Sequence, residues 1–139
     1  MTVAEQPKTK ELIRVALPFP PNTNHMYRHV GYKTLLSAEA RKYKEAVVTI
    51  IRRDHPDFVI PSRTPLEIEI TLICPASKIN TLDWDGHIKA VQDALFEASL
   101  IKANDAWIRR GTVQKTVSAP GGAGAVTVTL KLFEGVTQP

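Results

Sequence analysis

The sequence predicts an α+β fold: a single domain with a small mixed β-sheet and two main helices packed on one face, in the order β-α-β-α-β-β. Several stretches alternate apolar and polar residues, as half-buried strands do, and two others repeat apolar residues at helical spacing. The 139 residues are enough for one domain with a real core and too few for two. We expect the domain at residues 12–134, between a flexible N-terminus, residues 1–11, and a C-terminal tail, residues 135–139.

The first strand is expected at residues 12–19, where the odd-numbered, apolar residues share one face and prolines follow. The polar stretch at residues 22–37 is a loop, or a loose hairpin around Gly31. Cations mixed with aromatic rings and amides suit a nucleic-acid backbone. A solvated loop whose tyrosines pack on the core is the alternative, and both interpretations stay open. The residues concerned are Asn22, Asn24, His25, Tyr27, Arg28, His29, Tyr32 and Lys33.

Ser37 can cap a helix over residues 38–53, with Glu39 in its first turn. Arg41 and Lys42 lie on its polar faces. Such cations usually form only a solvated surface, but here they follow directly on the basic loop. The expected buried stripe consists of Tyr43, Val47 and Ile50, joined by Ala40 and Ala46.

The clearest strand covers residues 65–74, where apolar residues at even positions alternate with Glu67 and Glu69. Both glutamates are expected to face solvent, and Glu69 has a minor alternative role in the acidic site that follows. Cys74 is the only cysteine, so no disulfide can form within the chain. Because it closes an apolar strand, we expect it to be buried rather than catalytic.

The stretch DWDGHIKAVQDAL begins at Asp83, and the rest of the chain is organised around it. A helix from Asp83 or Asp85 to about Ser99 would place Asp85, Lys89 and Asp93 on one stripe, with Asp83 positioned as a cap. Two carboxylates one residue apart can face one Mg²⁺, and a lysine one turn further supplies a charge for a phosphate. The alternative is an acidic helix start that complements the helix dipole, followed by ordinary Asp–Lys pairs.

The C-terminal part is expected to form a turn at residues 100–105 and a strand at residues 107–118. Residues 119–125 are rich in glycine but lack the strand-to-helix context of a phosphate loop, so we interpret them as a hairpin connection. A last alternating strand covers residues 126–132.

The formal charge of +4 and the pI of about 9.3 are a mild indication of a polyanionic partner. No apolar run approaches the roughly 20 residues that span a membrane, and the polar first residues show no signal peptide. We therefore expect a soluble, cytoplasmic protein without membrane contact.

The D-x-D-x-x-x-K-x-x-x-D-A-L run resembles the signature of the RusA-type Holliday junction resolvases, usually written D-x-D-N-x-x-K-x-x-x-D. The stretch PPNTNHMYRH from Pro20 is similar to the N-terminal loop of that family. Residues 36–43 are similar to the start of its first helix, and residues 100–105 resemble the turn after the motif helix. The likeness covers most of residues 12–132 in order and spacing.

The resemblance implies a homodimeric, Mg²⁺-dependent endodeoxyribonuclease, with Mn²⁺ as a substitute, that cuts four-way DNA junctions symmetrically in recombination and repair. Asp83 and Asp85 match the carboxylates that hold metal. Asp105 matches a further acidic residue, if one residue is inserted in its turn. Lys89 matches the catalytic lysine, and Asp93 the last Asp, which orients that lysine or is purely structural. The candidates for contact with the DNA backbone are Arg28, Lys33, Arg41, Lys42, Arg109, Arg110 and Lys115.

Two departures from the family pattern bear on activity. Gly86 stands where the family has Asn, so a side-chain amide is missing, which His87 could replace in part. Asn104 and Asp105 stand where the family has paired acids. A catalytically weakened junction- or DNA-binding protein of the same fold is therefore the alternative function. A small-molecule phosphohydrolase, which would need a deep closed pocket, and a structural or adaptor domain are the other rivals.

Overall fold

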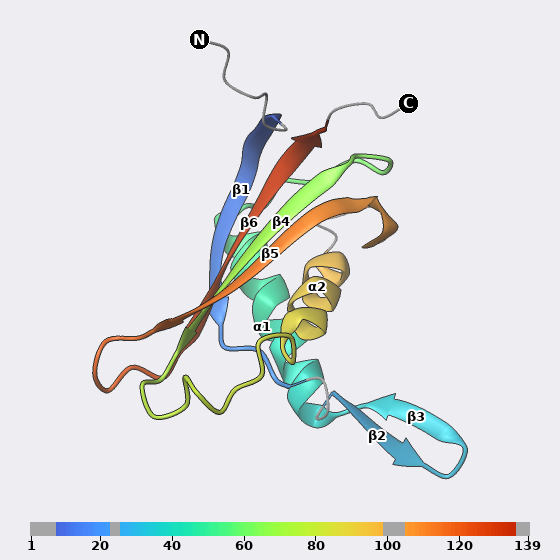
Figure 1. Cartoon of the computed structure of the whole chain (residues 1–139). Coiled ribbons are helices and arrows are strands. Elements are labelled where there is room, and N and C mark those ends of the chain that lie inside the picture. Colours follow the sequence, from blue (N-terminus) through green and yellow to red (C-terminus); the bar gives the residue numbers. More distant parts are fainter. Residues whose placement is uncertain (1–7, 23–25, 99–104, 136–139) are drawn as a thin grey trace.

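A four-stranded mixed sheet forms one layer of the domain (Figure 1). The computed structural model describes residues 8–22, 26–98 and 105–135. Across the sheet the strands follow the order β1 (Lys8–Pro18), β6 (Ala125–Glu134), β4 (Leu66–Cys74) and β5 (Ile108–Val117). β4 pairs in parallel with β5, whereas the pairs β1–β6 and β6–β4 are antiparallel. The predicted mixed sheet is thus confirmed.

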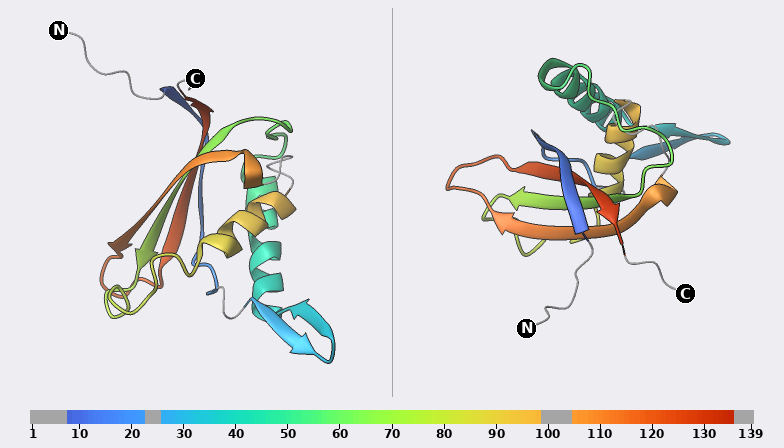
Figure 2. Two further views of the ribbon diagram at one scale, coloured as in Figure 1. Left: turned by 45° about the vertical axis from the view of Figure 1, so that its right-hand side comes forward. Right: turned by 90° about the horizontal axis from the view of Figure 1, so that it is seen from above.

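Two helices, α1 (Ala38–Asp54) and α2 (Ile88–Glu97), cover the same face of the sheet (Figure 2). This arrangement confirms the predicted α+β fold with both helices on one side. Ser37 caps α1 as expected, because its Oγ accepts a hydrogen bond of 3.1 Å from the backbone N–H of Ala40. Neither of these helices is long and apolar enough to span a membrane.

The core lies between the helices and the sheet, and Cys74 is fully buried in it, as expected. Tyr43 fastens α1 to the end of β1, since its hydroxyl donates a hydrogen bond of 3.0 Å to the carbonyl oxygen of Pro18. Burial raises the pKa of this tyrosine. The stripe that α1 buries is Ala40, Tyr43, Val47 and Ile51, and the expected Ile50 and Ala46 are only half-buried.

A two-stranded hairpin, β2 (Tyr27–Val30) and β3 (Lys33–Leu36), projects from the body beside the start of α1 (Figures 1 and 2). Gly31 occupies its turn with φ of 59°, so of the two expected possibilities, a loop or a loose hairpin around this residue, the structure has the hairpin. We call the hairpin the arm. Asn24 and His25, which were expected in the same stretch, lie outside the described residues.

Two expectations about where the strands begin and how they connect were wrong. β1 begins at Lys8 rather than at residue 12, because its first residues pair with the end of β6, where Lys8 is opposite Glu134. Residues 119–124 do not connect a hairpin: β4 lies between β5 and β6, so the chain crosses the end of β4 here. The crossing is close, since a Cβ on Gly124 would lie 3.1 Å from the carbonyl oxygen of Ile73.

The face of the sheet away from the helices carries Glu67 and Glu69, because alternate residues of a strand point to opposite faces. Glu67 is only 5% exposed, so its expected solvent-facing position was wrong; β4 is a central strand whose neighbours cover it. Glu69 accepts a hydrogen bond of 2.7 Å from Lys131 Nζ, which raises the pKa of that lysine. Glu69 therefore lies on the wrong face for the minor role in the acidic site.

Candidate active site

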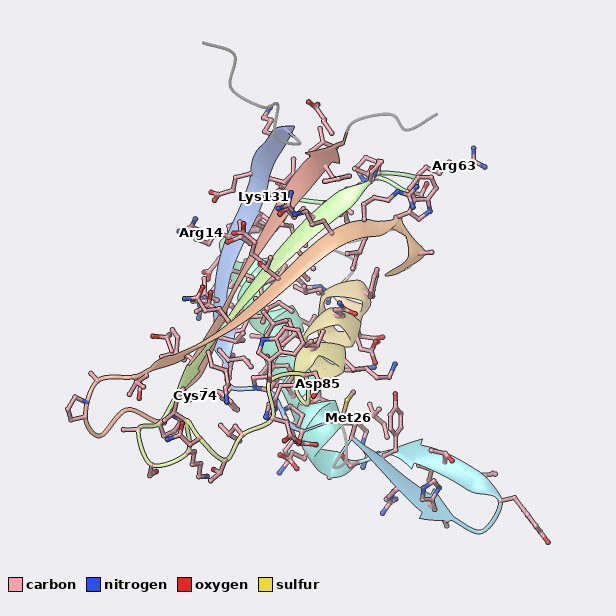
Figure 3. The ribbon with its side chains drawn as sticks, viewed as in Figure 1. Arg14, Met26, Arg63, Cys74, Asp85 and Lys131 are labelled. Atoms are coloured by element: carbon pink, nitrogen blue, oxygen red, sulfur yellow. The ribbon has the colours of Figure 1, made fainter. Side chains whose placement is uncertain are left out.

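Asp83 and Asp85 lie in a loop before α2, and both side chains are exposed. Figure 3 labels Asp85 beside the start of α2. We call residues 83–87 the motif loop. The expected helix start at Asp83 or Asp85 was wrong, because α2 starts only after His87, which makes no side-chain capping bond. Asp83 is thus no cap, and Asp85 lies outside the helical stripe. Gly86 contributes to this late start, since glycine disfavours helix by about 1 kcal/mol relative to alanine.

Tertiary contacts hold the motif loop on two sides. Trp84 Nε1 donates a hydrogen bond of 2.8 Å to the carbonyl oxygen of Val113 in β5. On the other side, His87 Nδ1 lies 3.0 Å from the carbonyl oxygen of Pro20, and the buried ring packs edge-on against Phe19 with centroids 5.0 Å apart. These partners are 29 and 67 residues away along the chain, so the sequence alone gave no signal for them.

Lys115, on β5, supports the segment that leads into the motif loop. Its Nζ donates hydrogen bonds of 2.8 Å each to the carbonyl oxygens of Ile79 and Leu82. The ammonium group is half-buried and engaged within the fold. Contact of Lys115 with DNA stays a prediction, whereas its support of the residues just before Asp83 is visible in the structure.

Replacing Lys115 by Met is expected to lower the free energy of unfolding by about 2 kcal/mol, because two carbonyl groups lose a charged donor. Urea unfolding followed by circular dichroism measures the change. Lys78→Met is the matched control, since Lys78 is an exposed lysine of the same loop, and it should stay within about 0.5 kcal/mol. A Lys115→Met protein of unchanged stability but weakened DNA affinity would contradict the structural role.

Lys89 lies in the first turn of α2, next to the motif loop, and its side chain is 52% exposed. Its Nζ is 3.6 Å from Asp93 Oδ2, one helical turn further. The Asp93 side chain is 29% exposed, and a partly exposed i,i+4 pair of this kind contributes only about 0.3–0.5 kcal/mol. The lysine is therefore held loosely, and its ammonium group remains accessible to a phosphate.

Four of the predicted DNA-contacting cations lie on the arm and on the first turns of α1. The base of the arm connects them: Met26 is buried against Ala40 of α1 and Ala90 of α2, so the arm, the start of α1 and the start of α2 meet there. In Figure 3 the labels of Met26 and Asp85 mark this end of the two helices. The four exposed cations are Arg28 and Lys33 on the arm and Arg41 and Lys42 on α1.

Arg109 and Arg110 lie at the start of β5, apart from the arm. Arg109 Nη1 donates a hydrogen bond of 3.1 Å to the carbonyl oxygen of Ala106, and the guanidinium lies 5.1 Å from the ring centroid of Trp107. Arg110 Nε is 3.5 Å from Glu67 Oε1. The structure therefore places these two arginines in local contacts, and their role in DNA binding stays a prediction.

The donor set at the motif loop fits a hard divalent cation. Asp83 and Asp85 form no ion pair with other described side chains, so their oxygens face solvent without a competing cation. Mg²⁺ is commonly bound through one or two carboxylates and keeps several waters. Among the described residues no group of three or more His, Cys, Asp or Glu gathers. The side chain of Asp105 is outside that set; its backbone begins a 3₁₀ turn, Asp105–Trp107, directly before β5.

Two hollows, of about 460 and 290 Å³, lie along α1 and the segment that follows it. Neither is lined by Asp83, Asp85 or Lys89. The carboxylates are instead presented on an open surface. Such a site suits a large substrate that lies across the surface better than a small molecule held in a pocket.

The comparisons with known proteins all point to one family. The family described as endodeoxyribonuclease RusA matches residues 18–131. Proteins named crossover junction endodeoxyribonuclease RusA, from Shigella sonnei (strain Ss046), Escherichia coli (strain K12) and Enterobacteria phage 82, are each 31% identical to this chain over 115 residues. These alignments cover 83% of this chain and 92% of each relative.

Proposed function

The chain belongs to the RusA family of endodeoxyribonucleases, and we propose that it is a Mg²⁺-dependent, structure-selective nuclease that resolves four-way DNA junctions by paired symmetric cleavage. The motif loop carries the proposal. It presents two exposed carboxylates, Asp83 and Asp85, immediately before the helix that bears Lys89. Acidic ligands for a metal ion, with a cation beside them, suit the metal-assisted hydrolysis of a phosphodiester.

Each residue of the site has a proposed role. Asp83 and Asp85 would hold Mg²⁺, with Mn²⁺ as a substitute, and Asp105 would be a third ligand. The bound ion supplies an activated water and offsets charge on the scissile phosphate. Lys89 would donate to a non-bridging oxygen of that phosphate and stabilise the charge that develops there. Cleavage would leave a 5′-phosphate and a 3′-hydroxyl.

The arm and the start of α1 would bind the DNA backbone. Their cations can neutralise phosphates, and contacts of that kind carry no sequence information, so they fit recognition of a branched shape. A C2 homodimer would present two equivalent motif loops to a nearly symmetric junction, which accounts for paired cuts. Junction affinity measured at a series of salt concentrations tests the DNA-binding role of these cations. The logarithm of the affinity should fall by about 0.9 per log unit of salt concentration for each neutralised phosphate.

Tyr32 lies in the turn of the arm and is fully exposed, as is unusual for an aromatic side chain. Stacking of such a ring on an unpaired base is worth about 1–3 kcal/mol. We expect Tyr32→Ser to weaken binding to a four-way junction by about tenfold and to leave binding to linear duplex unchanged. Fluorescence anisotropy in EDTA measures both affinities. The control is Val59→Ser, at an exposed apolar residue beyond α1; equal losses on junction and duplex would rule out stacking at the branch.

The proposed function is tested with a synthetic four-way junction, labelled on one strand at a time, in Mg²⁺ and in EDTA. We expect nicks at matching positions on two opposite strands, only with the metal, and no cutting of a duplex of the same sequence. Binding without nicks would favour the weakened relative, to which the absence of an amide at Gly86 points. A protein that neither binds nor cuts the junction would refute the proposal.

A further inference from the structure

Gly86 has no side chain although its backbone would accept one. Its φ is not among the positive values found at Gly31, Gly121 and Gly124, so the backbone conformation does not require glycine. A neighbour fills the space instead: an added Cβ would lie 2.8 Å from Nδ2 and 3.6 Å from Cγ of Asn22, so the Asn22 side chain would have to shift to admit it. The amide of Asn22 therefore occupies the space that a residue 86 side chain would fill.

This space borders the candidate metal ligands. The same added Cβ would lie 3.2 Å from Cβ of Asp83, so the Asn22 amide and the Asp83 side chain adjoin one small volume. Asn22 itself is half-buried and follows two buried prolines, Pro20 and Pro21, whose fixed φ angles limit the freedom of the segment. Because the carbonyl oxygen of Pro20 also lies 3.0 Å from His87 Nδ1, the segment after β1 adjoins the motif loop at two points.

We propose that Asn22 is a positioning residue, which supplies from the segment after β1 the side-chain amide that the motif lacks at Gly86 and so fixes the carboxylate of Asp83. The inference rests on the proposed function, because it assigns Asn22 to the same site. His87 does not serve this purpose. Its ring is buried and turned to Pro20, and its Nε2 has no hydrogen-bond partner among the described residues and no access to solvent.

Moving the amide between the two positions tests the proposal. Asn22→Ala removes the amide. Gly86→Asn adds a second amide, which would clash with that of Asn22. The double variant Asn22→Ala/Gly86→Asn leaves a single amide, at residue 86 of the motif. We expect Asn22→Ala to reduce the single-turnover cleavage rate and the affinity for Mn²⁺ by about 10- to 100-fold, as for outer partners of metal ligands. The double variant should recover most of both, while Gly86→Asn alone should be impaired by the clash.

Three readouts keep the outcomes distinct. Cleavage is measured on the junction, Mn²⁺ affinity by electron paramagnetic resonance of the DNA-free protein, and junction affinity in EDTA, which should stay within about twofold because only the metal site changes. Asn80→Ala, at an exposed Asn of the preceding loop, is the matched control. Unchanged rate and Mn²⁺ affinity in folded Asn22→Ala, or a double variant no better than Asn22→Ala, would overturn the proposal. If the unaltered protein binds Mn²⁺ but cuts no junction, the proposed function fails while the Mn²⁺ data still decide the role of Asn22.

Discussion

An Asp85→Asn variant is expected to bind a four-way junction as tightly as the unaltered protein and to leave it uncut. The amide keeps the shape of the side chain but loses the negative charge that a hard cation needs. The cleavage rate should fall by at least about 100-fold, since changes to the outer partners of a metal site alone cost about 10- to 100-fold. Single-turnover cleavage in Mg²⁺ measures the rate, and gel shift in EDTA measures binding.

Because the side chain of Asp85 is exposed, its replacement should not disturb the core, so a loss of cleavage would not reflect misfolding. Asp57→Asn is the control, at another exposed Asp in the segment after α1. If the motif loop were only a structural turn, Asp85→Asn would change stability by about 1 kcal/mol at most and would leave cleavage intact. That result would remove the loop from the active site.

Lys89→Met is expected to reduce cleavage by about 100- to 1,000-fold, the loss typical when one donor to a developing charge is removed. Methionine keeps the length of the side chain and the helix propensity but carries no charge. Single-turnover rates at saturating Mg²⁺ isolate the chemical step from metal binding. Because Lys89 is half exposed, the stability of the variant should stay close to that of the unaltered protein.

Asp93→Asn separates the two roles of the Asp93 carboxylate. The Lys89–Asp93 pair is partly exposed and 3.6 Å long, so a structural role predicts a rate within about threefold of the unaltered protein. A loss close to that of Lys89→Met would show that Asp93 orients the lysine. Full activity of Lys89→Met itself would contradict its assignment as the catalytic lysine.

Local patterns predicted the elements well where burial and capping are decided by nearby residues. The alternation in β4 gave the correct core face, and Ser37 gave the correct start of α1. The exposure of Glu67 was misjudged because its burial depends on the strands beside β4, not on the alternation of residues within β4. The glycine-rich stretch before β6 was misjudged for a related reason: turn chemistry indicates that the chain reverses, but not which strand it then pairs with.

The candidate site was predicted in part. The spacing of Asp83, Asp85 and Lys89 identified the residues, but a helix over all three was wrong because Trp84 and His87 are bound to distant segments that hold the loop open. Residues of the motif are adjacent in sequence, whereas these partners come from β5 and from the end of β1. The missing amide at residue 86 was read from the sequence, but its replacement by Asn22 depends on a contact across the fold.

The measurement that tests the central claim most directly is anomalous X-ray diffraction from a crystal of the protein soaked in Mn²⁺. The claim is that the motif loop holds the divalent ion that cleaves the junction. It predicts an anomalous peak within about 2.0–2.3 Å of carboxylate oxygens of Asp83 and Asp85. A peak bound by other residues, with none at these two carboxylates, would contradict it.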